Sequence, residues 1–365
     1  MDKVIHNILK RIEDEGYEAY IVGGFVRDKL LGKDSYDVDI CTNARPMNLK
    51  DIFPINQNSN GYGGFNLKIK RYNIDITTYR KEKAYVGHNP AEVEYVNSLF
   101  EDIRRRDFTI NSFCMDKNDN VLDLLNAMDD LKNKTIKVVG DADYKFSEDP
   151  LRMLRAIRFA TILDFNIDDV ALESIKKNYG LVSKLSDERI KEEIIKILSS
   201  SNFRKGLNLL IETRINEVIG LKNNIDNITY CSDILGMLAQ IDIKKINLTH
   251  TEEGIVKILK KLLQKGQIDN FALFNYGLYP CTVVSEILNI KKSEVNKMYE
   301  KLPIKSMKDI DINGNEIMQT LNLKPGKEVG ELMISVRNAI LNGIIGNKKS
   351  EIKKFLLDGV QHEQG

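Results

Sequence analysis

A short apolar strand that runs into two glycines and then a helix is the feature that most restricts the fold of this 365-residue chain. Residues 20–22 are apolar and strand-like, Gly23 and Gly24 follow, and residues 25–31 have a helical pattern. Glycines at such a junction permit positive φ angles and let backbone N–H groups approach a ligand closely. A helix N-terminus there favours phosphate. Arg27, one turn into the helix, can reach the same anion.

Two acidic residues follow at the start of the next predicted strand, which covers residues 38–41. Asp37 and Asp39 stand two positions apart, so their side chains point to the same face of a strand. Neighbouring carboxylates repel each other unless a cation lies between them, and Mg²⁺ commonly joins carboxylates to substrate phosphates. A glycine pair alone is usually a turn, and a lone pair of acids is usually a solvated strand end. Their close succession predicts nucleotidyl transfer with two Mg²⁺ ions.

Residues 23–32 and 37–42 together resemble the signature of class II tRNA nucleotidyltransferases. These are the CCA-adding enzymes, which are related to bacterial poly(A) polymerases within the polymerase-β-like nucleotidyltransferase superfamily. The resemblance implies that Gly24 and Arg27 hold phosphates. It also implies a third carboxylate on a neighbouring strand, for which Asp75 is the candidate because it precedes a Thr-Thr-Tyr-Arg run. The alternative for this residue is an ordinary acid at a strand edge.

By the same resemblance, the catalytic carboxylates are Asp37 and Asp39, with Asp75 assisting, and the first two bind the metal.

A run of three arginines precedes an apolar segment at residues 108–115. Such a run is usually a solvated face or a helix end. Here Arg106 and Asp107 belong to a stretch that resembles the RRDFTINA motif of the family, with Ser112 at the usual alanine position. The resemblance implies that Arg106 contacts the nucleotide and that Asp107 orients the sugar or neighbouring arginines.

A helix start is predicted at Ser147, which can serve as N-cap. Asp149 and Arg152 are three positions apart and would lie side by side on this helix, where the simplest interpretation is a salt bridge. A carboxylate acceptor beside a guanidinium donor also complements the Watson–Crick edges of cytosine and adenine. The same pair would meet mismatched groups on uracil and guanine, at a considerable cost in binding.

This pair matches the EDxxR motif that acts as a protein template in class II enzymes. The resemblance implies that Arg155 and Arg158, at successive three-residue steps, contact the base or the phosphates. Residues 186–190 resemble the next family motif, which braces the base-reading helix. Side-chain capping by Ser186 is expected to add little there.

The composition changes along the chain. Residues 20–140 mix short strands with helices, whereas the pattern from Ser147 onward is almost continuously helical. The fold class expected is an α+β nucleotidyltransferase head with a small mixed sheet, followed by all-α neck, body and tail. The boundaries expected are 1–145 for the head, 146–200 for the neck, 201–270 for the body and 271–365 for the tRNA-binding tail.

The overall charge of +1 does not by itself indicate a polyanion partner. The four cysteines are far apart and form no CxxC pair, and no apolar stretch is long enough to span a bilayer. A reduced, cytoplasmic protein without membrane contact is therefore expected. The four histidines show no metal-ligand spacing, and an HD phosphohydrolase pair is absent.

The resemblance implies template-independent addition of C and A from CTP and ATP to the tRNA 3′ end. Mg²⁺ would be the cofactor, the acceptor stem and TΨC arm would be bound, and a homodimer is possible. The loop after Arg80 differs from the family pattern, because residues 85–90 lack an Asp and an Arg expected there. The alternatives are a CC-adding or A-adding specialist, a poly(A) polymerase, and a non-catalytic tRNA-binding protein.

Overall fold

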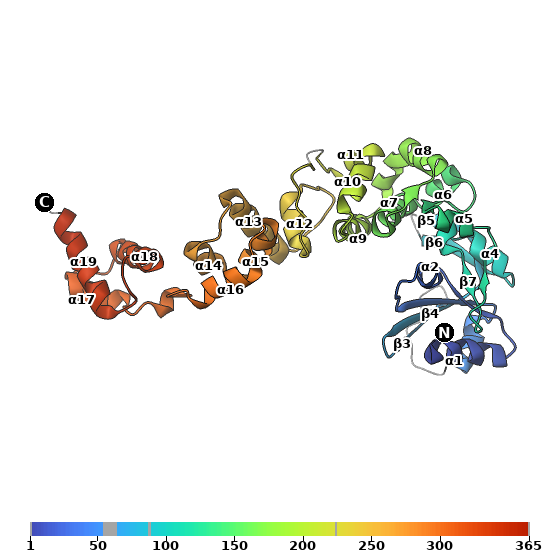
Figure 1. Cartoon of the computed structure of the whole chain (residues 1–365), viewed down its shortest axis with the longest axis horizontal. Coiled ribbons are helices and arrows are strands. Elements are labelled where there is room, and N and C mark those ends of the chain that lie inside the picture. Colours follow the sequence, from blue (N-terminus) through green and yellow to red (C-terminus); the bar gives the residue numbers. More distant parts are fainter. Residues whose placement is uncertain (1, 54–63, 87–88, 223–224, 364–365) are drawn as a thin grey trace. The chain divides into compact units, whose positions relative to one another are not determined.

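The computed structural model divides the chain into two compact units (Figure 1). The described residues are 2–53, 64–86, 89–222 and 225–363. The first unit comprises Met1–Ile225 and Ile243–Asn247, and the second comprises Asp226–Asp242 and Leu248–Gly365. The expected α+β head followed by helices is confirmed. The described residues contain no helix of the length and apolar character needed to cross a membrane. The four-part division by residue number stays a prediction.

The first unit is built on a six-stranded mixed sheet in the order β3-β4-β2-β1-β7-β8. Strands β2 and β4 are parallel, and every other neighbouring pair is antiparallel. The parallel register places Asp39 opposite Asp75 and Asp37 opposite Asn73. The strands are β1 (Ala19–Val22), β2 (Asp37–Thr42), β3 (Phe65–Ile69), β4 (Tyr72–Thr78), β7 (Cys114–Met115) and β8 (Val121–Leu122).

The alternation of side chains along β2 explains why Asp37 and Asp39 point away from the core. The Asp37 and Asp39 side chains are exposed, whereas Val38 and Ile40, which alternate with them, are buried. This alternation is the period of two that a pleated strand imposes. The acids therefore share one face of the sheet.

Helices cover the sheet because their apolar residues recur at helical spacing. In α1 (Lys3–Asp14), the buried residues Ile5, Ile8, Leu9 and Ile12 form one stripe. The Asp2 carboxylate accepts a hydrogen bond from the Val4 N–H at 2.8 Å and caps the first turn. The other helices of this part of the chain are α2 (Gly24–Leu30), α3 (Pro46–Ile52), α4 (Leu99–Arg104) and α5 (Met128–Lys132).

The segment that departs from the family pattern is a β-hairpin. It consists of β5 (Arg80–Val86) and β6 (Asn89–Tyr95), which pair in antiparallel fashion. Gly87 and His88, which belong to the atypical stretch, lie outside the described residues. A further short strand, β9, covers Thr135–Ile136.

The part of the first unit that follows the sheet is helical, except for one short strand. The two-residue strand β10 (Asn166–Ile167) lies in the predicted all-helical section and pairs with β9. Helices α7, α9 and α10 pack against one another, as their green ribbons in Figure 1 show. The helices are α6 (Ala142–Glu148), α7 (Leu151–Leu163), α8 (Asp169–Asn178), α9 (Asp187–Leu198), α10 (Phe203–Glu212) and α11 (Ile215–Ile219).

The predicted helix start at Ser147 is wrong. Ser147 lies in the last turn of α6, where its hydroxyl donates to the Tyr144 carbonyl oxygen at 2.7 Å. The helical conformation is interrupted at Asp149, whose backbone is extended, with a φ of −141° and a ψ of 97°. Pro150 explains the break, because the residue before a proline is disfavoured in the helical region. Helix α7 begins only at Leu151.

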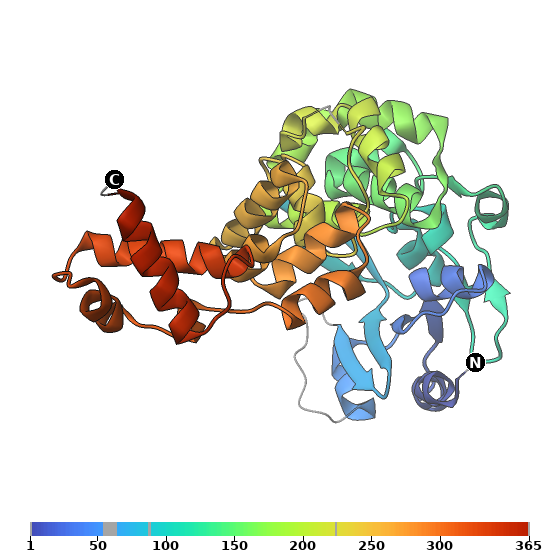
Figure 2. The same ribbon diagram turned by 60° about the vertical axis from the view of Figure 1, so that its left-hand side comes forward.

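The second unit is helical throughout its described residues. In α13, Thr249 and Glu252 form a reciprocal capping box and Gly266 ends the helix with a φ of +68°. Helices α17, α18 and α19 pack with one another and appear in red in Figure 2. The helices are α12 (Ile234–Gln240), α13 (His250–Lys265), α14 (Asn270–Tyr276), α15 (Leu278–Ile287), α16 (Lys292–Glu300), α17 (Gly314–Leu321), α18 (Lys327–Leu341) and α19 (Lys349–Glu363).

Gly206 permits the close crossing of α10 over α7 and α9. A Cβ atom at this position would overlap the side chains of Thr161 and Ile197. We expect Gly206→Ala to lower the free energy of unfolding of the first unit by about 1–3 kcal/mol through overpacking. Gly180→Ala is the matched control, since a Cβ there meets nothing within 4 Å. Urea denaturation of both variants tests this, and equal stability would contradict the close-packing argument.

Candidate active site

The two glycines occupy the turn between β1 and α2, as predicted. Gly23 has a φ of +77°, a conformation that L side chains rarely adopt. A Cβ atom there would lie 3.3 Å from Asp39 Oδ2 and 3.4 Å from Arg106 Nη1. Gly23 is therefore needed both for its backbone angle and for the space it leaves beside two predicted site residues. Gly24 begins the helix.

Three acids from two adjacent strands meet beside this turn. The Asp37 carboxylate accepts from the Asn73 side chain at 2.9 Å, and the Asp75 carboxylate accepts from Asn66 at 2.8 Å. Although Asp39 is open to solvent, the surrounding protein removes enough of its hydration to raise the pKa of its carboxyl group. Arg106 opposes this effect, whereas the negative charges of Asp75 and Asp37 add to it.

The donor set fits a divalent cation that shares its ligands with a substrate. Among the described residues, no group of three or more His, Cys, Asp or Glu side chains is arranged to hold a metal by itself. Asp37 and Asp39 nevertheless lie side by side on one face of β2. The negative charge of Asp37 adds to the larger effect of lost hydration in raising the pKa of Asp39. A cation that takes two carboxylates and completes its coordination with water and phosphate oxygens suits such a pair.

Arg106 is held next to these acids by a residue that the sequence did not single out. Asp102 is fully buried, and its carboxylate lies 3.3 Å from Arg106 Nη2 and 2.8 Å from Arg105 Nε. Burial raises the pKa of Asp102, but the two guanidinium groups outweigh it and lower the pKa overall. The i, i+4 spacing of Asp102 and Arg106 in the sequence could have indicated this ion pair.

Arg27 is turned into the protein. Its Nη1 donates to Asn111 Oδ1 at 2.6 Å and its Nη2 to Asp28 Oδ1 at 2.7 Å, with little exposure to solvent. A Cβ atom at Gly24 would lie 3.5 Å from Arg27 Nη2, so the guanidinium remains beside the glycine turn. Its contacts in this structure brace the turn.

Asn111 connects Arg27 to helix α7 through Asp107. Its Nδ2 donates to Asp107 Oδ1 at 3.2 Å, and Asp107 Oδ2 accepts from Arg155 Nε at 2.8 Å. Burial alone would raise the pKa of Asp107, but the charge of Arg155 and hydrogen bonds from Arg155, Asn111 and the Phe108 N–H lower it to about 2. Asp107 thus orients a neighbouring arginine, one of the two roles that the motif implied.

Three predicted site arginines surround one aromatic ring. The guanidinium carbons of Arg27, Arg155 and Arg158 lie 5.2, 5.5 and 4.0 Å from the centroid of the Phe159 ring. Such positions over an aromatic ring are favourable for a cation. Arg158 Nε also donates to Glu193 Oε2 at 2.5 Å, so α9 is tied to α7. Burial lowers the pKa of Arg158, and Glu193 partly restores it.

Asp149 and Arg152 lie close together, but not as a pair on one helix. Asp149 stands outside α7, and its Oδ1 accepts from the Leu151 N–H at 3.1 Å. Burial raises its pKa, although Arg152 opposes the effect. Arg152 is buried, and its Nη1 donates to Glu148 Oε2 and to the Lys145 carbonyl oxygen, each at 2.9 Å.

The structure thus identifies acidic partners of the site arginines that the sequence analysis did not single out. Glu148 stands immediately before the predicted acid, and Glu193 occupies the apolar face of α9 between Ile190 and Ile194. A glutamate at a buried helical position requires a cationic partner, which was a usable signal. The partner itself was not readable, since Arg158 lies on a different helix.

Models of known families and curated relatives cover most of the chain. A poly(A) polymerase head domain model matches residues 19–137, an RNA and SrmB binding site of polymerase A matches 164–220, and a tRNA nucleotidyltransferase domain 2 matches 239–356. The CCA-adding enzyme of Limosilactobacillus reuteri is 34% identical over 93% of this chain and 92% of its own length. That of Lactococcus lactis is 32% identical over 96% and 95%.

A solved structure resembles the whole chain. The crystal structure of the Bacillus stearothermophilus CCA-adding enzyme in complex with CTP superposes with a TM-score of 0.85 at 26% identity. The match covers 100% of this chain and 99% of that one.

The depressed pKa of Asp107 makes a prediction about acid stability. A carboxyl group with a folded pKa of about 2 stabilises the fold above its ordinary pKa of 3.8, and the effect is lost as the pH falls through 2. We expect Asp107→Asn to lower the free energy of unfolding at pH 7 by roughly 2 kcal/mol. The difference from the parent should shrink between pH 4 and pH 2. Urea denaturation at several pH values measures it, with the exposed Asp129→Asn as control; a pH-independent difference would contradict the assignment.

Proposed function

This chain belongs to the family of CCA-adding enzymes, and we propose that it adds C and A from CTP and ATP to the 3′ end of tRNA without a template, releasing pyrophosphate. The observation that supports this most directly is the parallel register of β2 and β4. That register sets Asp39 opposite Asp75, beside Gly23 and Arg106. A module that only binds RNA has no need of three clustered carboxylates.

We assign Mg²⁺ to Asp37 and Asp39, which fit a cation shared with substrate phosphates. When bound, the metal would favour ionisation of the attacking 3′-hydroxyl and offset the charge of the triphosphate. Asp75, held by Asn66, would assist from the neighbouring strand.

The glycine turn and its arginines would hold the triphosphate. Gly24, at the first turn of α2, offers backbone N–H groups that point toward an anion. Arg106, beside Gly23 and Asp39, carries a positive charge that Asp102 keeps in place. Arg27 would act on the phosphates mainly by fixing this turn.

Asp149 and Arg152 would select the base. The amine of cytosine or adenine would donate to Asp149, whose raised pKa reflects burial that its protein partners do not fully offset. Arg152, fixed by Glu148 and the Lys145 carbonyl, would donate to the ring nitrogen. Uracil and guanine would leave these buried groups mismatched, which is costly. Arg155 and Arg158 would support this arrangement through Asp107 and Glu193.

The helical second unit would hold the acceptor stem and TΨC arm through shape and charge, as is usual for A-form RNA. The four cysteines are free and buried, in keeping with a place in the cytoplasm. A homodimer stays a prediction.

One assay tests the activity. tRNAs lacking CCA, or ending in C or CC, are incubated with labelled CTP, ATP or both, and the added length is read on a gel. We expect completion to CCA on all three. Long A-tails would indicate a poly(A) polymerase, addition of C or A alone a specialist, and no addition a binding protein.

Asp39→Ala should abolish incorporation, because the face of β2 that holds the metal would lose one of its two carboxylates. The melting temperature should change little, since Asp39 is exposed and not part of the core. Asp34→Ala, an exposed acid outside the strand, serves as the matched control. Appreciable turnover by Asp39→Ala would refute the metal assignment.

Asp149→Asn should relax base selection, because an amide can donate to the carbonyl of uracil. We expect incorporation of UTP relative to CTP to rise at least about tenfold. Ser147→Ala, two residues earlier at an exposed position of α6, should leave the ratio unchanged. An unchanged ratio in both variants would reject the base-reading role.

A further inference from the structure

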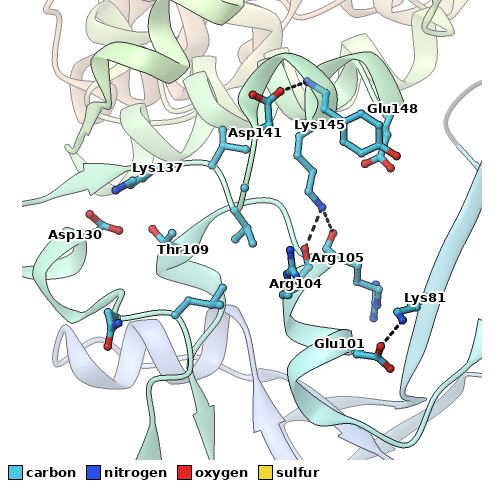
Figure 3. A pocket seen from close by; sticks show the side chains of 16 residues that line it. Lys81, Glu101, Arg104, Arg105, Thr109, Asp130, Lys137, Asp141, Lys145 and Glu148 are labelled. Carbon is cyan, nitrogen blue, oxygen red and sulfur yellow. Dashed lines mark hydrogen bonds and ion pairs between the residues drawn. The ribbon is translucent and has the colours of Figure 1, made fainter.

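The first unit contains a cavity that is separate from the side chains assigned above to catalysis and nucleotide binding. It has a volume of about 780 Å³ and is lined by residues of α4, α5 and α6, of the segment 137–140 and of the start of β5 (Figure 3). None of the predicted catalytic or nucleotide-binding side chains lines it. Its size is typical of sites for small organic ligands.

Thr109 offers this cavity a buried polar atom. The residue is only 7% exposed, and its Oγ1 has no hydrogen-bond partner among the residues that the structure describes. Figure 3 shows Thr109 on the same side of the cavity as Asp130 and Lys137. A buried hydroxyl without a partner is costly, so a ligand that bonds to it would remove that cost.

Charged residues of both signs line the cavity, which suits an anion that also carries hydrogen-bond donors. Arg104 and Lys137 line it and have no ion-pair partner within the described part of the chain. Lys145, in contrast, is occupied, because its Nζ donates to the carbonyl oxygens of Arg104 and Arg105 at 3.1 and 3.2 Å. Asp130, beside Lys137, supplies an acceptor.

An apolar wall completes the lining. Leu125, Val138 and Val139 contribute it. Arg104 and Lys137, which have no ion-pair partner among the described residues, suit a phosphate group. The Asp130 carboxylate and the Thr109 hydroxyl suit sugar hydroxyl groups, and the aliphatic side chains suit the face of a base. We propose that this cavity binds a nucleoside phosphate, at a site separate from the one where the incoming nucleotide reacts.

The site bears on base selection through α6. Lys145 and Glu148 line the cavity, and the same two residues hold the Arg152 guanidinium through a carbonyl oxygen and a carboxylate. An occupant would therefore contact the turn that fixes Arg152. Binding itself does not depend on the transfer reaction and can be measured without it.

The test is equilibrium dialysis of the full chain with labelled AMP, which carries no triphosphate to react. We expect Lys137→Gln and Thr109→Val each to weaken binding about five- to tenfold, as loss of one ion contact or one hydrogen bond to a ligand does. Lys132→Gln is the matched control, since this exposed lysine of α5 does not line the cavity. Melting temperatures verify that all variants fold.

A fourth variant separates the two sites. Arg152→Ala alters the proposed base-reading position, so it should remove any AMP bound there and leave the component of AMP binding that Lys137→Gln and Thr109→Val weaken. Loss of binding in Arg152→Ala, with normal binding in Lys137→Gln and Thr109→Val, would show that AMP occupies the reaction site and would overturn the proposal. Absence of AMP binding at millimolar concentration would overturn it as well.

The ligand could be a free nucleotide or a nucleotide of an RNA chain, since both present the same chemistry. Dialysis is repeated with saturating tRNA. Displacement of AMP would identify an RNA nucleotide as the occupant, and retention of AMP would identify a free nucleotide. Either result supports the cavity as a nucleoside-phosphate site, provided that Lys137→Gln weakens the binding.

Discussion

A buried chain of polar groups joins the sheet to the helices that follow it in the first unit. Arg27 donates to Asn111, Asn111 donates to Asp107, and Asp107 pairs with Arg155 on α7. A charge removed from water is tolerated only when partners surround it. Each member therefore fixes the next, so the distance between the glycine turn and α7 is set by hydrogen bonds. The ring of Phe159 fills the space that the arginines enclose.

A single proline determines where the base-reading acid stands. Pro150 keeps Asp149 out of the helical region, so the carboxylate projects from the break between α6 and α7. Arg152 remains on α7 and is held from the last turn of α6. The donor thus comes from α7 and the acceptor from the break before it, each held by its own contacts, an arrangement suited to discrimination by geometry.

The sequence revealed the features that depend on neighbours along the chain. The glycine turn, the exposed acids of β2 and the helical repeat all follow from spacing. The cap at Ser147 was misjudged because the constraint of Pro150 on the preceding residue outweighed a good capping residue. Asp102, Glu148 and Glu193 were missed as partners. Their importance comes from which arginine each meets, and Arg158 and Glu193 meet only once α7 and α9 have packed.

The parallel pairing of β2 with β4 also affects the order of assembly. Asp39 and Asp75 become neighbours only when the segment between them, which contains α3 and β3, has closed into a loop during folding. Contacts between residues remote in sequence form late, because the entropy of closing the loop must be lost first. The helices of the second unit rely on nearer contacts and can form sooner. The carboxylate cluster should therefore be among the last features to mature, so a chain that has gained most of its helix content can still lack its catalytic centre.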